Sequence, residues 1–171
     1  MFTLAARVAR RGGGSLRVWS CGCSAGHEPY GLALAWECTL ARLFPTVSLE
    51  VVGTDVSAEA LTEAAAATFH CFAVANLPVE WVARCFEVFD DDAPGGGGGG
   101  AVYRLRSSVT RHVKFLAATD GDARTAAPRG PPFALVRCCG GGCSVTTLRR
   151  RWAARPDRRA ARRGLRPGRS L

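Results

Sequence analysis

Two glycines and two carboxylates lie close after two apolar runs of the sequence, where they could bind a ligand that contains a nucleoside. Gly22 and Gly26 follow a short apolar run, and Glu28 comes just after them. Glycine lets a backbone turn tightly and approach a ligand closely. Asp55 directly follows the apolar stretch 49–54, where a carboxylate can accept hydrogen bonds from both hydroxyls of a ribose. These four residues favour a nucleotide-type cofactor site.

The elements that must position these residues alternate between strands and helices. The apolar runs 16–21 and 49–54 predict buried strands, and the spacing of Leu32, Trp36, Leu40 and Leu43 or Phe44 predicts one helix over 28–44. Ser57 can cap a further helix, about 58–68, and Pro78 can open a short one over 78–86. Strands are also expected within 102–117 and over 132–138. The order predicts an α/β domain with a parallel sheet.

The glycine spacing taken alone leaves the interpretation open. The pattern G-x-x-x-G differs from the dinucleotide fingerprint G-x-G-x-x-G, and a loop without a ligand explains it about as well. Glu28 could simply be an acid favoured at a helix start, and Asp55 could be a helix cap.

The wider stretch RVWSCGCSAGHEPYGLAL, residues 17–34, closely resembles the first S-adenosylmethionine motif of CheR-type chemoreceptor methyltransferases. VVGTDVSAEALTEA, LPVEWVARCFE, RLRSSVTRHVKFLAATD and PFALVRC are similar to later landmarks of that family, in the family's order. FTLAARVARRGGG, at the N-terminus, is similar to the helix and linker before the family's first strand. The resemblance covers about residues 2–138 and implies a Rossmann-like, class I methyltransferase sheet with flanking helices.

The resemblance also implies which residues bind S-adenosylmethionine. The loop from Cys21 to Ser24 would run beside the methionine part of the cofactor, and Glu28 would face the ammonium and carboxylate groups of that part. Asp55 would bind the ribose, and Val56 and Thr119 would flank the adenine. The implied cofactor-binding set is Cys21, Gly22, Cys23, Ser24, Gly26, Glu28, Asp55, Val56 and Thr119. No catalytic residue is assigned, because an acceptor carboxylate is already ionised at neutral pH.

The sequence departs from the family's pattern at several positions. His27 replaces one of two glutamates, Thr119 and Asp120 stand where the family has Asn-Leu, and the Arg-Asn expected near Arg137 is not there. The family's last strands have no counterpart, so we expect an incomplete sheet of about four strands. Residues 1–139 are expected to form the domain, with a flexible glycine-rich insert at 90–100.

The positive charge lies in the last 23 residues. Residues 1–148 hold thirteen basic and thirteen acidic residues, whereas residues 149–171 hold ten arginines and one acid, which gives the chain its net charge of +9. Residues 140–171 are rich in Arg, Ala, Gly and Pro and are expected to be a disordered basic tail, which a shifted reading frame in GC-rich DNA would also produce. Attraction to nucleic acid through this tail would be incidental.

The eight cysteines do not have zinc-ligand spacing, so we expect reduced thiols, no bound metal and a cytoplasmic protein. No apolar run is long enough to span a bilayer. The sequence thus predicts methyl transfer from S-adenosylmethionine to a glutamate of a receptor-like protein. Two alternatives remain: a catalytically inactive cofactor-binding or interaction fragment, and a basic-tailed nucleic-acid binder.

Overall fold

A five-stranded sheet forms the centre of the molecule. The computed structural model describes residues 1–89, 100–118, 134–139 and 142–147. Within them the strand order is β6 (Val113–Ala117), β2 (Val47–Asp55), β1 (Gly14–Cys21), β7 (Ala134–Cys139) and β8 (Gly142–Thr147). The first four strands are parallel, and β8 is antiparallel to β7. The predicted α/β domain with a parallel sheet is confirmed.

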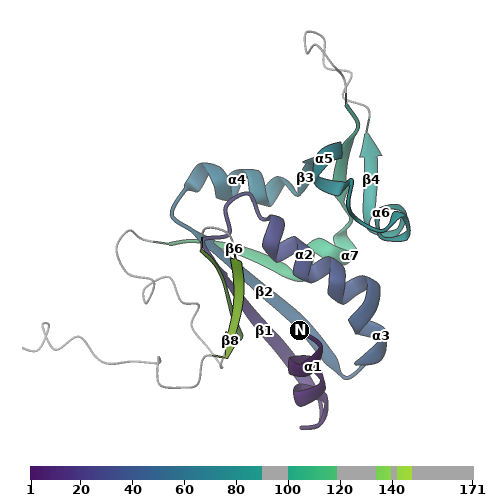
Figure 1. Cartoon of the computed structure of the whole chain (residues 1–171), viewed down its shortest axis with the longest axis vertical. Coiled ribbons are helices and arrows are strands. Elements are labelled where there is room, and N and C mark those ends of the chain that lie inside the picture. The colour runs from purple at the N-terminus through teal and green to yellow at the C-terminus, as the bar shows by residue number, and fades with distance from the viewer. Residues whose placement is uncertain (90–99, 119–133, 140–141, 148–171) are drawn as a thin grey trace, which may run out of the picture.

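One nearly continuous helical segment crosses the sheet over β1 and β2 (Figure 1). It consists of α2 (His27–Ala35), a π-helical turn η1 (Trp36–Leu40) and α3 (Ala41–Leu43), and it ends before Pro45. The predicted helix over 28–44 is therefore confirmed. A separate helix, α1 (Phe2–Ala9), precedes β1 at the end of the sheet remote from the glycine loop, as expected.

A first hydrophobic core fills the space between this helical segment, α1 and the sheet. Trp36 and Leu40 project from the helix and are buried, as the predicted apolar stripe requires. Phe44 packs on the same core, but Leu43 is 57% exposed, so of the two residues proposed to end the stripe Phe44 is the right one. The remaining buried members come from α1, β1 and β2: Ala5, Leu16, Val18, Val47, Leu49 and Val51.

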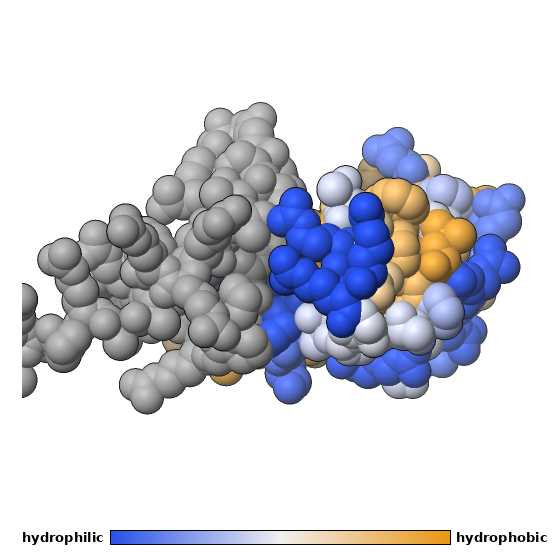
Figure 2. All heavy atoms as spheres, turned by 90° about the horizontal axis from the view of Figure 1, so that it is seen from below, coloured by the Kyte–Doolittle hydropathy of each residue, from blue (hydrophilic) through white to orange (hydrophobic). Residues whose placement is uncertain are grey.

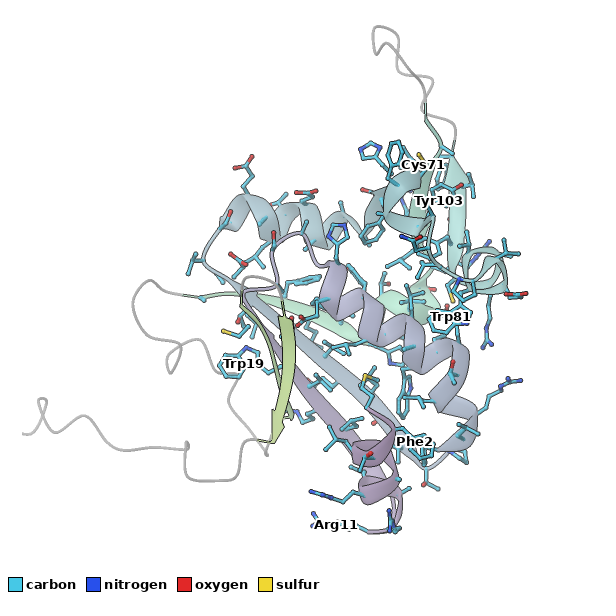
Figure 3. All side chains as sticks on the ribbon, in the orientation of Figure 1. Phe2, Arg11, Trp19, Cys71, Trp81 and Tyr103 are labelled. Carbon is cyan, nitrogen blue, oxygen red and sulfur yellow. The ribbon has the colours of Figure 1, made fainter. Side chains whose placement is uncertain are left out.

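A small antiparallel sheet, which the sequence did not predict, covers the other side of α2. Its order is β3 (Thr68–His70), β5 (Val102–Leu105) and β4 (Phe86–Phe89). Short helices α5 (Cys71–Val74), α6 (Val79–Cys85) and α7 (Ser107–Thr110) belong to the same region, where Cys71, Trp81 and Tyr103 lie in Figure 3.

A second hydrophobic core joins this small sheet to α2. Its buried members are Tyr30, Ala33, Leu34, Ala67, Val74, Cys85, Phe86, Leu105 and Val109. The predicted apolar side of α6 is confirmed, because Cys85 and Phe86 are buried and Trp81 and Val82 pack beside them.

The face of the main sheet away from α2 is partly polar. Trp19 lies on this side (Figure 3), and its indole N–H donates to the hydroxyl of Thr54 at 3.0 Å. Arg17 pairs with Glu50 at 2.6 Å, and Lys114 lies 3.8 Å from the same carboxylate. The Arg17 guanidinium lowers the pKa of Glu50.

The lower end of the molecule in Figure 1 presents hydrophilic residues beside exposed apolar surface. Figure 2 shows a hydrophobic patch there, directly beside a hydrophilic group. Phe2 of α1 and Leu43 of α3 are more than half exposed at this end. Among the described residues, no helix has the length and apolar character needed to cross a membrane.

The expectation of a disordered tail from residue 140 onward is wrong for residues 142–147, which form β8. Val145, Thr146 and Thr147 are β-branched residues that favour strands, and the short separation from β7 permits antiparallel pairing. The main sheet therefore has five described strands rather than about four. The remainder of the tail, 148–171, and most of the glycine-rich insert, 90–99, lie outside the described residues.

Candidate cofactor site

The loop between β1 and α2, residues Gly22–Gly26, is held against the end of β2. The backbone N–H groups of Gly22 and Cys23 both donate to the carbonyl oxygen of Thr54, at 2.8 and 3.0 Å. Three loop residues have positive φ: Gly22 (72°), Ser24 (48°) and Gly26 (84°). The short strand-to-helix connection thus depends on residues that tolerate a left-handed backbone.

The two glycines of the loop are required for different reasons. A Cβ on Gly26 would lie 3.0 Å from the Cβ of Ala64 and 3.0 Å from Cζ of Phe115, so helix, sheet and loop meet there without room for a side chain. A Cβ on Gly22 would meet nothing within 4 Å. Gly26 is therefore required for close packing, whereas Gly22 leaves the backbone of the loop open on one side.

Asp55, the last residue of β2, organises both connections at this edge of the sheet. Its Oδ2 accepts a hydrogen bond from the Ser24 amide at 2.8 Å, and its Oδ1 accepts one from the Ser57 amide at 3.0 Å. The cap of helix α4 (Ala58–Ala66) is Ser57, whose hydroxyl oxygen accepts from the Ala60 amide at 3.1 Å, as predicted. The alternative that Asp55 is itself the helix cap is therefore wrong. Each carboxylate oxygen has further lone pairs for another donor.

Glu28 lies in the first turn of α2 and faces the end of β1. Its Oε1 accepts a hydrogen bond of 2.6 Å from the hydroxyl of Ser20, which is fully buried. Ser20 was not identified from the sequence as a partner. The alternation of side chains along β1 was a usable signal, because Ser20 lies two residues beyond Val18, which packs toward the helix.

Cys23 is a buried, uncharged thiol within the loop. Burial, followed by the negative charge of Asp55, raises its pKa to about 12. Gly53 of β2 makes room for it, since a Cβ there would lie 3.0 Å from the Cys23 sulfur and 2.8 Å from Cδ1 of Phe115. Cys21, at the end of β1, is half-buried.

The remaining predicted residues lie around the same edge. Val56 follows Asp55 and is 60% exposed, and the Ala118 amide donates to the carbonyl oxygen of Asp55 at 2.8 Å, which brings the end of β6 to the site. Thr119 follows Ala118 but lies outside the described residues. His27, which departs from the family's pattern, is exposed, and its ring lies 5.3 Å from that of Phe69 in β3.

This edge is also the place where the order of strands reverses. The chain runs from β1 to β2 and then to β6 on one side of β1, and later to β7 on the other side. Ligands of open parallel sheets bind outside the carboxyl ends of the strands at such a point. An open backbone at Gly22 lies near two carboxylates, Asp55 at the end of β2 and Glu28 in the first turn of α2, and this combination suits a ligand with an ammonium group and vicinal hydroxyls. The class defined by this fold and site is a Rossmann-like cofactor-binding domain.

Comparison with known proteins specifies the family. Residues 3–119 match the model of the CheR methyltransferase, SAM binding domain. The chain is 34% identical over 104 residues to chemotaxis protein methyltransferase 1 of Pseudomonas aeruginosa, an alignment that covers 58% of this chain and 36% of that protein. It is 31% identical over 116 residues to the chemotaxis protein methyltransferase of Escherichia coli, covering 67% and 37%. The corresponding protein 2 of Vibrio cholerae is 29% identical over 111 residues, covering 63% and 34%.

The chain therefore belongs to the CheR methyltransferase SAM-binding domain family, and S-adenosylmethionine is the cofactor that this family implies. It spans about a third of the length of these curated relatives.

Proposed function

We propose that the edge formed by the glycine loop, Glu28 and Asp55 binds S-adenosylmethionine. Asp55 would accept hydrogen bonds from the ribose hydroxyls, Glu28 would attract the ammonium group, and the open backbone at Gly22 would lie against the methionine part. Val56 and Thr119 would flank the adenine, and Cys21, Cys23, Ser24 and Gly26 would shape the loop. The observation that carries this assignment is that two carboxylates and an open glycine backbone, which lie as much as 33 residues apart in the sequence, meet at one sheet edge.

We further propose that the protein methylates a glutamate side chain of a receptor-like protein in the cytoplasm. S-adenosylmethionine supplies an electrophilic methyl group on a sulfonium sulfur. The acceptor carboxylate needs no general base, because it is ionised at neutral pH. The task of the protein's residues is then to fix the orientation of the cofactor and to exclude water, which is the main source of acceleration in a direct displacement. The neutral thiol of Cys23 adds no competing charge to the loop.

Calorimetric titration with S-adenosylhomocysteine tests the cofactor site directly. Replacing Asp55 with Ala should weaken binding by about 1–3 kcal/mol, since a charge-assisted hydrogen bond is lost. Glu59→Ala is the matched control, because Glu59 is an exposed acid in the first turn of the neighbouring helix α4. Equal affinity of the Asp55→Ala variant and the wild type would contradict the ribose assignment.

Transfer of a radiolabelled methyl group to a glutamate-bearing receptor peptide tests the activity. A carboxyl methyl ester releases labelled methanol in mild base, whereas methyl groups on nitrogen stay bound. Binding of the cofactor product without any base-labile label would instead support the alternative of a cofactor-binding fragment without activity.

A further inference from the structure

Two cysteine sulfur atoms that are distant in the sequence lie in direct contact where η1 meets the end of α6. Cys38 belongs to the π-helical turn η1, and Cys85 is the last residue of α6. Their Sγ atoms are 3.3 Å apart, although 47 residues separate them along the chain. A disulfide bond has a sulfur–sulfur distance of about 2.05 Å, so each sulfur would need to shift by well under an ångström.

The two thiols differ in their access to solvent. Cys85 is fully buried in the second core, the one that joins the small antiparallel sheet to α2. Cys38 is half-buried and packs on the edge of the same core. A dissolved oxidant therefore reaches the Cys38 thiol first, because the Cys85 thiol is not accessible to solvent.

The chain neighbours of both cysteines already hold the two segments together. Glu37 precedes Cys38, Arg84 precedes Cys85, and the carboxylate and guanidinium groups lie 3.6 Å apart. Glu37 also accepts from Arg111 at 3.3 Å, so it connects η1 to the residue that follows α7 as well. The approach of the two sulfur atoms is thus supported by ionic contacts and does not depend on the thiols alone.

We propose that Cys38 and Cys85 form a reversible disulfide that fastens α6, and with it the small sheet, to η1. With hydrogen peroxide as the oxidant, the Cys38 sulfur attacks one peroxide oxygen, the O–O bond breaks, and a sulfenic acid and water result. The Cys85 sulfur then attacks the Cys38 sulfur, the S–O bond breaks, and the hydroxide leaves as water with the Cys85 proton. Two thiols and one peroxide give one disulfide and two waters.

The disulfide would restrain the small antiparallel sheet and leave the candidate cofactor site unchanged. The turn η1 continues α2 at the end remote from the glycine loop, so the link does not touch the residues assigned to the cofactor. Burial and the neighbouring Cys38 thiol raise the pKa of Cys85 to about 12. Because the thiolate is the attacking form, this raised pKa slows the second step at neutral pH, and the disulfide closes slowly once Cys38 has been oxidised.

Peptide mapping of the whole oxidised chain tests the proposal. Trypsin releases residues 18–42, which contain Cys38, and residues 85–104, in which Cys85 is the only cysteine; residues 43–84 contain only Cys71. After treatment with peroxide or oxidised glutathione we expect peptide 85–104 to be linked to peptide 18–42 in the wild type and in the control variant Cys71→Ser. The link should be absent in Cys38→Ser, although that variant keeps Cys21 and Cys23 on the same peptide.

Thermal unfolding supplies a second measurement on the same samples. The disulfide would close the loop between Cys38 and Cys85, which are 47 positions apart. A loop of this length should raise the melting temperature by about 5–15 °C in the wild type and in Cys71→Ser, and dithiothreitol should reverse the rise. No oxidant-dependent rise is expected in Cys38→Ser or Cys85→Ser. The proposal is overturned if the link does not form, if it persists in Cys38→Ser, or if oxidation lowers the melting temperature of the wild type.

Discussion

Two strand-to-helix connections leave neighbouring strands at the same edge of the main sheet, yet they are built on different principles. The first connection, Gly22–Gly26, relies on positive φ angles and on the absence of side chains. The second connection, residues 56–57 between β2 and α4, relies on side-chain hydrogen bonds: Asp55 accepts from the Ser57 amide, and Ser57 caps the helix. The difference teaches that one turn is stabilised by backbone conformation and close packing, whereas its neighbour is stabilised by side-chain hydrogen bonds.

The two connections are not independent, because Asp55 also accepts the Ser24 amide of the first one. The hydrogen bond from the Ser24 amide therefore fixes the distance between the glycine loop and the Asp55 carboxylate. Variants that affect one connection and spare the other show how far the two can be separated.

The largest effect is expected from Gly26→Ala. The new Cβ would meet Ala64 and Phe115 at 3.0 Å in a left-handed conformation, so the free energy of unfolding should fall by about 2–4 kcal/mol. Gly22→Ala is the matched control: its φ is also positive but its surroundings are open, and about 1 kcal/mol is expected. Urea unfolding of both variants measures the difference, and equal losses would remove the distinction between packing and openness.

A smaller effect is expected from Ser57→Ala in the second connection. Losing the helix cap should lower the free energy of unfolding by about 1 kcal/mol. Affinity for S-adenosylhomocysteine should stay within about twofold of the wild type, since the carboxylate of Asp55 remains in place. A large loss of affinity together with unchanged stability would mean that Ser57 contacts the ligand.

The smallest effect is confined to alkaline solution and concerns Cys23. Its pKa is raised from 9.0 to about 12 in the folded protein, so its contribution to stability is present below pH 9 and is lost as the pH rises toward 12. Between about pH 8 and pH 10 the wild type should lose about 1 kcal/mol more than Cys23→Ala, with the difference at pH 7 as the reference. Parallel curves of stability against pH would show that Cys23 ionises alike in the folded and unfolded states.

The sequence predicted much of the main sheet because its signals are local. The apolar runs at β1 and β2, the helical spacing that ends at Phe44, and the cap at Ser57 each act within a few residues, and each is confirmed. The small antiparallel sheet escaped prediction for the opposite reason. Its strands are only three or four residues long, and β5 pairs with β3 and β4 across large separations in the chain.

The candidate site residues were predicted from the resemblance of residues 17–34 to the family's first motif, because the glycine spacing taken alone fits a loop without a ligand about as well. By itself the sequence determined the family motif, the alternation of strands and helices from β1 to α4, and the neutral charge of residues 1–148 beside the basic residues 149–171. Only the tertiary structure decided which partners these residues take: Ser20 for Glu28, the Ser24 amide for Asp55, and Cys38 for Cys85. The physical reason is that side-chain contacts depend on how distant segments pack, and no local pattern encodes that distance.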